Sequence, residues 1–418
     1  MNPASGTTAV GSDSWIGVDN IDDAFHERIA QFVAVVKWDA LLSLSSHIRS
    51  GIPCKLSDEF HVGCFYMVRR IVFDDQVSWV VRLRMPPIAD ERSAESLARI
   101  MQAGVAGMKF LKAKTDIPVP EVHSYNTEQD NVVGAPYILM DYIHGNVAFE
   151  MRRAKDCDSG LYGTPERDRS FRREMARIQA VLATFTFDQI GSLYQNPTTE
   201  EFFVGPDVVT DKGPWSNSSD YYADVAQHSL RVCVDNAEPE VLTSASFTLP
   251  VIFTNLMELC GGSDGNSSNG PAAPFCLTNR DLGPQSLLVD EEFHIVGVID
   301  LDVIMAAPYE IAAQFPLCAG LDPEPPGHVE TAPRSLEFIK RTETLIREYN
   351  GMVKEIEEGA NSPGRKIWNV MLSNGARVVR GLSQYQRHNQ FLNDMWIEAY
   401  TRLLSEHFSS TAPTSSAN

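Results

Sequence analysis

The spacing of apolar residues predicts alternating helices and short strands in the first third of the chain. Apolar residues recur at helical intervals over Asp22–Val36 and again over Trp38–Ile48. Two runs rich in β-branched and aromatic residues come next, Val62–Phe73 and Val77–Arg84. The polar sequence DDQ separates these two runs, so we expect them to pair as a β-hairpin.

A long helix and two further strands complete this first predicted domain. Apolar residues form one stripe along about Asp90–Ala113, which predicts an amphipathic helix. Val119–Tyr125 and Pro136–Ile143 have the composition of strands. The predicted order is therefore strand, strand, helix, strand, strand, preceded by two helices.

The second part of the chain, from Gly145 onward, has mainly helical spacing. The predicted helices are Phe171–Thr184, Tyr221–Val234, Val241–Leu259 and most of Ser335–Phe408. Between them lie an insertion rich in turn residues and aromatics and a low-complexity loop, Gln195–Trp215 and Gly261–Pro274. The predicted domains are a disordered tail at 1–18, an N-terminal lobe at 19–144, a helical lobe at 145–408 and a second tail at 409–418.

Composition and charge narrow the classes of protein that fit this pattern. The chain has 418 residues, of which 43% are apolar and 22% charged, which suits a globular protein of two lobes. The net charge of −20 argues against a nucleic-acid partner, because phosphate recognition needs a basic surface. The sequence has no run of about 20 apolar residues, so we expect no membrane-spanning helix. The seven scattered cysteines form no CxxC pair and the first residues lack a signal-peptide pattern, so we expect reduced thiols and a cytoplasmic location.

The segment Leu277–Leu301, LTNRDLGPQSLLVDEEFHIVGVIDL, has the most informative pattern of polar residues. It predicts a polar loop, a short strand, a turn, and a second strand that ends in an acidic pair, Asp300 and Asp302. Asp281 precedes this hairpin and Asp300 follows it. Phosphoryl transfer needs one carboxylate that accepts the proton of the attacking group and another that holds Mg²⁺ on the phosphates. The arrangement therefore favours phosphoryl-transfer chemistry over a set of ordinary loop aspartates.

This segment resembles the catalytic stretch of the aminoglycoside-phosphotransferase-like family, in particular of its fungal members. That stretch has the form H-x-D-L-x-x-x-N-x-L-V-D, followed by a strand ending in I-D-W. Four other stretches resemble the family in the expected order: SWVVRLRMP, TDIPVPEVHSY, VVGAPYILMDYIHG and AAPYEIAAQFP. The resemblance runs from about Phe60 to Pro316. It implies an α+β, bilobal protein-kinase-like fold with a small antiparallel N-lobe sheet, one N-lobe helix and a mostly helical C-lobe, and it implies ATP and Mg²⁺ as cofactors of a small-molecule phosphotransferase.

The resemblance also implies roles for residues of the catalytic segment. Asp281 matches the catalytic base and Asp300 matches the Mg²⁺ ligand. Asn279 stands where the family has a histidine that orients the loop. Ser286 stands where the family has an asparagine that coordinates metal beside Asp300, and a serine hydroxyl can also bind Mg²⁺.

Nucleotide-binding residues follow from the same resemblance. Arg82 matches the strand cation that holds the phosphates, a role that an arginine can fill with two parallel hydrogen bonds. Met140 would line the back wall of an adenine pocket, and main-chain groups of Asp141 and Ile143 would bind the adenine edge. The loop over the phosphates would be Gly63-Cys64-Phe65-Tyr66.

One helix position departs from the family pattern. The glutamate that should pair with the strand cation falls at Gly104, so we expect a close backbone approach there in place of an ion pair. Glu95 lies more than two turns earlier and is a poor substitute. Losing one pre-organised charge lowers a rate by about 10²- to 10³-fold. Three interpretations therefore stay open: an active phosphotransferase, an enzyme of fungal specialised metabolism that uses the fold for another reaction, and a pseudokinase that binds nucleotide or a partner.

The acceptor site is the least defined part of the prediction. The resemblance places it in the second-lobe insertions, here Gln195–Val234, and in the C-terminal helices. Trp215, Tyr221 and Tyr222 either line such a pocket or belong to the hydrophobic core. The sequence leaves the substrate and the oligomeric state open.

Overall fold

The computed structural model of the chain describes residues 16–17, 26–63, 65–87, 92–154, 160–236, 253–257, 275–321, 333–360 and 365–385. The chain divides into two compact units. The first unit comprises Met1–Glu174, Tyr194–Phe202 and Gly283–Val303, and the second comprises Met175–Leu193, Phe203–Leu282 and Ile304–Asn418. This division differs from the predicted boundary at residue 144, because the hairpin that carries Asp300 belongs to the N-terminal unit.

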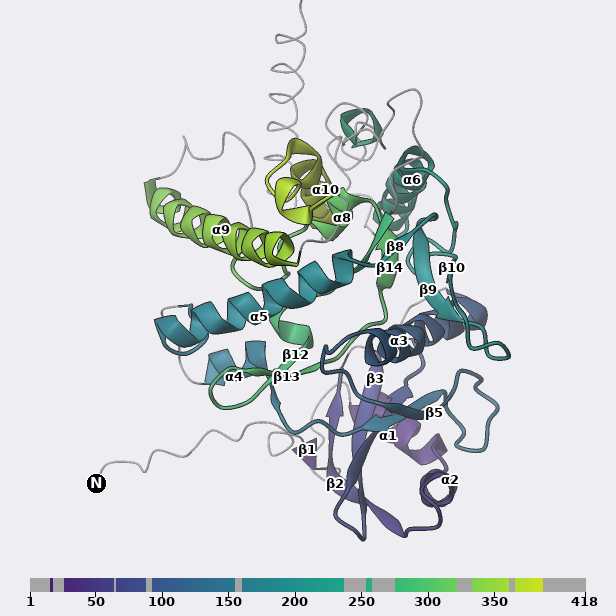
Figure 1. Ribbon diagram of the computed structural model, residues 1–418. Helices are drawn as coiled ribbons and strands as arrows, with labels where there is room; N and C mark the ends of the chain where they lie inside the picture. Colours follow the sequence, from purple (N-terminus) through teal and green to yellow (C-terminus); the bar gives the residue numbers. More distant parts are fainter. Residues whose placement is uncertain are drawn as a thin grey trace, which may run out of the picture. The chain divides into compact units, whose positions relative to one another are not determined.

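The first unit contains a six-stranded antiparallel sheet in the order β1-β2-β3-β4-β6-β5 (Figure 1). Its strands are β1 Ile16–Gly17, β2 Cys54–Val62, β3 Tyr66–Phe73, β4 Ser78–Arg84, β5 Val122–Asn126 and β6 Tyr137–Asp141. The prediction of one strand over Val62–Phe73 is wrong, because β2 ends at Val62 and β3 begins at Tyr66. β1 pairs with β2, with Ile16 opposite Phe60, so part of the predicted N-terminal tail is an edge strand.

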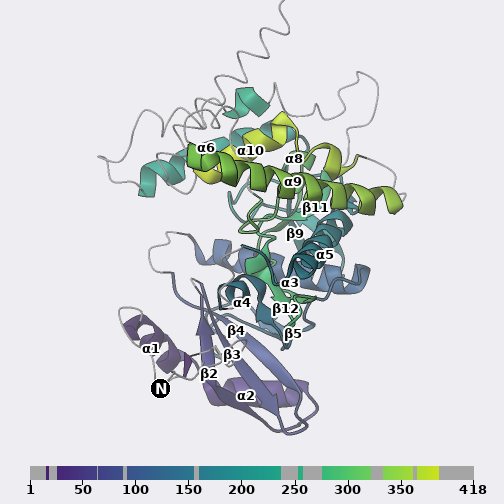
Figure 2. The ribbon, with the colours of Figure 1, turned by 90° about the vertical axis from the view of Figure 1, so that its left-hand side faces the viewer.

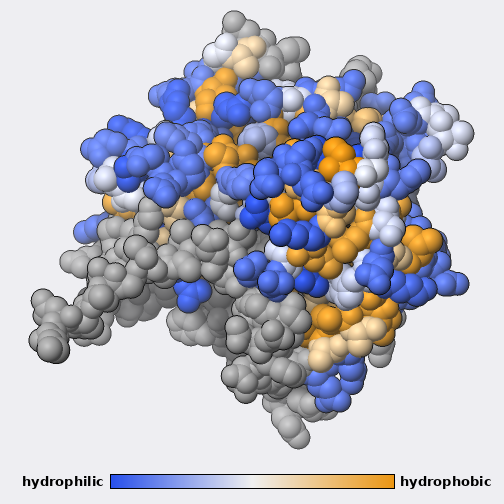
Figure 3. All heavy atoms as spheres, turned by 90° about the horizontal axis from the view of Figure 1, so that it is seen from below, coloured by the Kyte–Doolittle hydropathy of each residue, from blue (hydrophilic) through white to orange (hydrophobic). Residues whose placement is uncertain are grey.

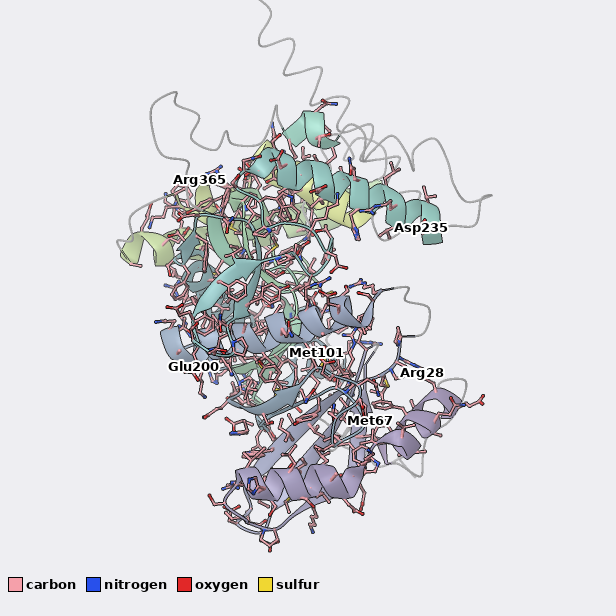
Figure 4. All side chains as sticks on the ribbon, turned by 90° about the vertical axis from the view of Figure 1, so that its right-hand side faces the viewer. Arg28, Met67, Met101, Glu200, Asp235 and Arg365 are labelled. Carbon is pink, nitrogen blue, oxygen red and sulfur yellow. The ribbon has the colours of Figure 1, made fainter. Side chains whose placement is uncertain are left out.

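Two helices pack against this sheet, α1 His26–Val35 and α2 Trp38–Ile48, and α2 has the predicted bounds. Figure 2 shows α2 lying along one face of β2, β3 and β4. Ile29, Phe32 and Leu41 from the helices share a buried core with sheet residues such as Met67, which Figure 4 labels. No single described helix is long and apolar enough to cross a membrane, and α1 and α2 pass that test only together, as a bent pair.

Helix α3, Ala94–Lys114, confirms the long amphipathic helix. The Ser93 side chain caps its first turn by accepting a hydrogen bond from the Ser96 N–H. The buried stripe includes Met101, labelled in Figure 4, and Gly104 one turn further along. The residue that replaces the expected glutamate therefore faces the interior.

A second, three-stranded sheet of the first unit has the order β13-β12-β7. Its strands are β7 Asn146–Val147, β12 Leu287–Val289 and β13 Ile295–Val298, and helix α4 Ala148–Ala154 follows β7. Two glycines let the segment after β6 approach this hairpin closely. A Cβ atom at Gly145 would lie 2.7 Å from Val296 Cγ2, and one at Gly297 would lie 3.0 Å from Ile143 Cδ1. Segment 143–145 therefore packs directly against β12 and β13.

The second unit holds most of a five-stranded sheet in the order β10-β9-β14-β11-β8. The remaining elements are α5 Pro165–Ala183, β8 Thr186–Phe187, β9 Gly191–Gln195, β10 Phe202–Gly205, α6 Ser218–Asn236, β11 Phe275–Asn279, β14 Ile304–Ala307, α8 Tyr309–Ala312, α9 Pro333–Gly359 and α10 Asn374–Tyr385, with 3₁₀ turns at Pro284–Ser286 and Ile367–Asn369. The predicted insertion thus contains strand β10. Of the predicted helix Val241–Leu259, residues 253–257 are helical and the rest lies outside the described residues, as do Gly261–Pro274 and the predicted C-terminal tail.

Trp215, Tyr221 and Tyr222 are core residues of the second unit. They are 6%, 1% and 5% exposed and belong to one buried cluster. A partly buried ion pair lies in the same unit, in which Arg365, labelled in Figure 4, donates to the buried Glu310 at 2.8 Å. The pocket role considered for the three aromatic residues is therefore not supported.

Hydrophilic residues make up much of the surface in Figure 3, with separate apolar patches among them. The exposed large apolar residues of the described part of the chain are spread through the sequence: Val35, Phe65, Val77, Val132, Phe203, Val234 and Leu372. Phe65 is notable because it lies in the predicted phosphate loop and is 54% exposed.

Candidate functional site

Arg82 of β4 is the centre of a charged cluster in the first unit. Its Nη2 donates to Asp300 Oδ1 at 2.9 Å and to Asp302 Oδ2 at 3.2 Å, and its Nη1 donates to Asp302 Oδ1 at 3.1 Å. The two parallel bonds to Asp302 are the geometry that fixes a guanidinium most firmly. The Arg82 side chain is 13% exposed, that of Asp302 12% and that of Asp300 44%. Asp302 is thus the inner partner and Asp300 the outer one.

The charges of this cluster depend on one another. Burial alone would lower the pKa of Arg82, but the Asp302 carboxylate, Tyr66 and Asp300 together outweigh burial and raise it. Burial raises the pKa of Asp302, Arg82 opposes that rise, and Asp300 adds to it. The Arg82 guanidinium also stacks on the Tyr66 ring, 3.8 Å from its centre. A permanently charged arginine therefore lies between two carboxylates, one of which reaches solvent.

Gly104 makes room for Asp302. A Cβ atom at position 104 would lie 2.5 Å from Asp302 Oδ1 and 3.5 Å from the Asp302 Cα, which is too close for the oxygen to stay in place. The predicted close backbone approach is therefore confirmed, but the expectation of a missing ion pair is wrong. The carboxylate that pairs with Arg82 comes from Asp302, two residues after Asp300, instead of from the helix.

Asp300 lies in a strained turn after β13. Its φ is 62°, in the left-handed region that aspartate adopts more readily than most residues. The two residues before it are anchored, because the Val298 N–H donates to the Pro118 carbonyl at 2.7 Å and the Ile299 N–H donates to the Ser286 carbonyl at 2.9 Å. Such strain persists only where the surrounding structure holds it, and it is concentrated at functional sites.

Ser286 does not have the geometry of a metal ligand. Its side chain is fully buried, and its hydroxyl donates to the Gly283 carbonyl at 3.0 Å while accepting from the Gly283 N–H at 3.3 Å. These bonds close the turn before β12. The structure therefore gives Ser286 a role in holding the hairpin, and the prediction that it binds Mg²⁺ is not supported.

The end of β6 and the residues that follow it support the adenine prediction in part. Met140 is buried, at 8% exposure, as a back wall requires. The Asp141 N–H donates to the Glu121 carbonyl at 3.0 Å, so this N–H is already engaged and is not open to an adenine contact. The Ile143 N–H has no hydrogen-bond partner among the described residues. Ile143 is thus the main-chain donor that fits the prediction better.

The predicted phosphate loop is the tip of the β2–β3 hairpin. The Gly63 N–H donates to the Tyr66 carbonyl at 2.9 Å, and the Met85 N–H donates to the Phe65 carbonyl at 2.9 Å. The second bond ties the tip to the end of β4, near Arg82. A Cβ atom at Gly63 would meet nothing closer than 3.9 Å, so the fold does not require glycine there. Cys64 lies outside the described residues.

The part of the catalytic segment that lies in the second unit contains Asn279, Arg280 and Asp281. Asn279 ends β11, is 4% exposed, and accepts the Asp281 N–H on its side-chain oxygen at 3.2 Å. Arg280 donates to Asp207 Oδ1 at 2.6 Å, and the fully buried Asp207 also accepts two hydrogen bonds from Thr210. Asn279 therefore orients the loop that carries Asp281, the role that the resemblance implies. No sequence pattern pointed to Asp207, which lies in the insertion.

The buried Arg280–Asp207 pair allows a stability test. Asp207→Asn removes the charge that neutralises a buried guanidinium, so we expect the free energy of unfolding to fall by about 3 kcal/mol. Asp188→Asn, which changes an exposed acid of the same unit, should alter it by less than about 0.5 kcal/mol. Urea denaturation of both variants measures the difference, and equal stability of the two would show that the pair does not hold the loop.

Among the described residues there is no cluster of three or more histidine, cysteine, aspartate or glutamate side chains that could hold a metal ion without other ligands. Of the acidic pair, Asp302 is held by Arg82 through both oxygens, and Asp300, whose side chain is 44% exposed, is the candidate metal ligand. A site with so few protein carboxylates suits Mg²⁺, which keeps several waters and completes its shell with substrate phosphates.

Comparison with known proteins finds relatives that match part of the chain and solved structures with a similar fold. No protein-family model matches the chain. A protein of Aspergillus fumigatus named as a subtelomeric hrmA-associated cluster protein is 33% identical over 111 residues, which cover 24% of this chain and 20% of that protein. Altered inheritance of mitochondria protein 9, mitochondrial, of Kluyveromyces lactis is 24% identical over 299 residues, which cover 60% of this chain and 48% of that protein. The matches thus span less than half the length of both relatives.

Among solved structures, one assigned as an aminoglycoside phosphotransferase of Ralstonia eutropha JMP134 has a TM-score of 0.50 and 15% identity. The match covers 88% of this chain and 99% of that one. The likeness shows the fold alone. The chain has the α+β, protein-kinase-like fold of aminoglycoside phosphotransferases, as the sequence predicted.

Proposed function

We propose that the chain is an ATP- and Mg²⁺-dependent phosphotransferase that acts on a hydroxyl or amine group of a small molecule. The observation that carries this proposal is the cluster of Arg82, Asp300 and Asp302. A phosphotransferase of this fold positions phosphates with a strand cation, and it holds that cation with a carboxylate. The cluster contains both parts, although the helix carries Gly104 in place of glutamate.

The charged and main-chain groups of the site fit both proposed cofactors, ATP and Mg²⁺. Arg82 would hold phosphate oxygens, the Ile143 N–H would bind the adenine edge, and Asp300 would hold Mg²⁺. The exposures support this division, since the Asp300 side chain is 44% exposed and that of Asp302 is 12% exposed. Bound Mg²⁺ would neutralise charge on the phosphates. Asp302 would keep Arg82 in place while Asp300 turns to the metal.

Asp281 is the proposed base that accepts a proton from the acceptor group. Its loop is fixed by the Asn279 side chain and by the Arg280–Asp207 ion pair. Fixed loops favour this chemistry, because a general base must lie within hydrogen-bond reach of the proton that it takes. Burial raises the pKa of Tyr221, which lies beside Arg280, to about 12, so this tyrosine stays neutral at physiological pH.

Two alternatives are weakened by the cluster. The pseudokinase and the non-phosphoryl interpretations rested mainly on the missing ion pair, and Asp302 supplies that pair. The buried Ser286 hydroxyl still leaves Asp300 without a second side-chain metal ligand on the hairpin.

The cellular compartment is a separate part of the proposal. The Kluyveromyces lactis relative is named as mitochondrial, whereas the cysteines of this chain suggest the cytosol. Fractionation of cells that express the tagged chain would decide between the two.

Transfer of labelled phosphate tests the proposal. We expect the chain with Mg²⁺ and γ-labelled ATP to phosphorylate at least one member of a panel of hydroxyl and amine metabolites. Chelation of Mg²⁺ should stop transfer, and Asp281→Asn should lower the rate by about 10²-fold or more, since it removes the general base. Saturable ATP binding without transfer to any compound would instead identify a nucleotide-binding module.

A further inference from the structure

Arg70 of β3 lies on the same face of the six-stranded sheet as Arg82. In the β3–β4 register, Arg70 is opposite Val80 and Val68 is opposite Arg82. Alternate residues of a strand, and residues directly opposite each other on an antiparallel pair, point to the same face of a sheet. Arg70 is therefore on the face where Arg82 meets its carboxylates, one alternate pair further along β4.

The Arg70 side chain joins β4 to the segment that follows β6. Its Nε donates to Ser78 Oγ at 3.0 Å. Its guanidinium carbon lies 4.6 Å from the centre of the Tyr142 ring, which is the geometry of a cation–π contact. Tyr142 is also bonded to β4 directly, because its N–H donates to the Ser78 carbonyl at 3.2 Å. Arg70, Ser78 and Tyr142 thus contact one another in a closed set, which we call the Arg70 clamp.

Asp141, the residue before Tyr142, is fixed from the other edge of β6. Its Oδ1 lies 2.8 Å from His123 Nε2, and its Oδ2 accepts the Glu121 N–H at 3.1 Å. Its own N–H donates to the Glu121 carbonyl. The two residues before Ile143 are therefore held from both sides, by β4 and by the chain around β5, whereas the Ile143 N–H has no hydrogen-bond partner in the described part of the chain.

Strand β4 sets the distance between the clamp and the cation proposed to hold the phosphates. Ser78 and Arg82 are four residues apart on this strand, which corresponds to about 13 Å at the usual rise of a β-strand. A nucleotide has its base edge and its phosphates at opposite ends of a comparable length. The clamp therefore holds Ile143 at a distance that suits the base of a nucleotide whose phosphates are bound by Arg82.

We propose that Arg70 and Tyr142 are positioning residues for the nucleotide base, which act by fixing the Ile143 N–H. This inference rests on the proposed function and assigns part of base recognition to side chains that do not touch the base. An arginine suits the role, because its planar group stacks on a ring while its Nε donates a hydrogen bond. A misplaced main-chain donor loses its bond to the base, whereas the contacts of Arg82 with phosphates do not depend on it.

A purely structural role for the clamp predicts a different result. A contact that only stabilises the sheet would, when lost, weaken all ligands to the same degree. Loss of positioning weakens only ligands that carry a base. The ratio of adenosine affinity to tripolyphosphate affinity therefore separates the two roles.

Competition binding on the full chain tests the inference, with a fluorescent ATP analogue displaced by adenosine or by inorganic tripolyphosphate. We expect Arg70→Gln and Tyr142→Leu each to weaken adenosine by about fivefold to tenfold, with tripolyphosphate within about twofold of the parent. The double variant should lose little more than either single variant, because both residues act through one contact. Circular dichroism verifies that each variant is folded.

Two further variants serve as controls. Tyr142→Phe keeps the ring that Arg70 stacks on and should retain the parent's ratio of affinities. Arg69→Gln is the matched control, since Arg69 is the next residue of β3, stacks on Trp38 and donates to the Ser57 carbonyl on the opposite face of the sheet. It should also leave the ratio unchanged.

Each contrary result has a distinct meaning. If the parent chain binds the ATP analogue and a folded Arg70→Gln or Tyr142→Leu variant keeps the parent's ratio of affinities, the inference is wrong and the proposed function stands. The same holds if tripolyphosphate displaces the analogue from the parent chain and adenosine does not. If the parent chain does not bind the ATP analogue, both are wrong.

Discussion

Asp300→Asn should lower Mg²⁺-dependent phosphoryl transfer by about 10³-fold while leaving the fold intact. The substitution keeps the size of the side chain but removes the negative charge that a metal needs, and metal-held charge stabilisation is a dominant contribution to such reactions. The Asp300 side chain is 44% exposed, so loss of its charge should have little effect on stability. Initial rates over a range of Mg²⁺ concentrations, together with circular dichroism, measure both effects.

The matched control for this experiment is Asp290→Asn. Asp290 lies on the same hairpin, accepts hydrogen bonds from the His294 and Glu292 main chain, and is outside the charged cluster. Its replacement should leave the transfer rate within about twofold of the parent, as expected of a residue remote from the reacting groups. Equal rates in the parent chain and Asp300→Asn would refute the assignment of the metal site.

The second large effect is expected from exchange of the carboxylate between Asp302 and Gly104. Gly104→Glu alone should destabilise the chain by about 2 kcal/mol or more, because its Cβ would displace the Asp302 oxygen that lies 2.5 Å away. Asp302→Gly alone should cost about 3 kcal/mol, because it leaves the buried Arg82 with the outer Asp300 as its acidic partner. Both variants should also bind ATP more weakly.

The double variant Gly104→Glu with Asp302→Gly restores the arrangement that the resemblance implies, in which the helix supplies the carboxylate. We expect the two changes to compensate each other, with a coupling of about 1 kcal/mol or more in the free energy of unfolding and partial recovery of ATP affinity. Denaturant unfolding of the four chains in the cycle gives the coupling. A Gly104→Glu variant that is more stable and binds ATP more tightly with Asp302 intact would contradict the exchange.

Local patterns predicted much of the fold correctly. Short stretches of sequence were enough to identify α2 and α3 by their apolar spacing, and the hairpins around β4 and β12 by their turn residues. β2 was missed because the segment CKLSDEFHV has no clear alternation, and a register shift between Leu56 and Phe60 interrupts its pairing with β3. Only Phe60 of this strand is buried, so its sequence shows little of the alternation of apolar and polar residues that identifies strands.

The site was predictable where a residue acts through its place in a motif. Arg82 and Asp300 come from such motifs, and the acidic pair with Asp302 was visible as well. That Asp302 fills the space beside Gly104 depends on the tertiary fold, because about 200 residues separate the two positions. The buried hydroxyl of Ser286 and the pairing of Asp207 with Arg280 are likewise consequences of packing. Residue identity alone does not distinguish these roles.

Calorimetric titration of ATP into the full chain, with Mg²⁺ and then with a chelator, tests most directly whether the Arg82 cluster belongs to a nucleotide site. We expect saturable binding of one ATP per chain in the presence of Mg²⁺, and at least about tenfold weaker binding without it, because Asp300 and the phosphates repel each other when no cation separates them. Absence of binding, or binding that is equally tight without Mg²⁺, would contradict the account.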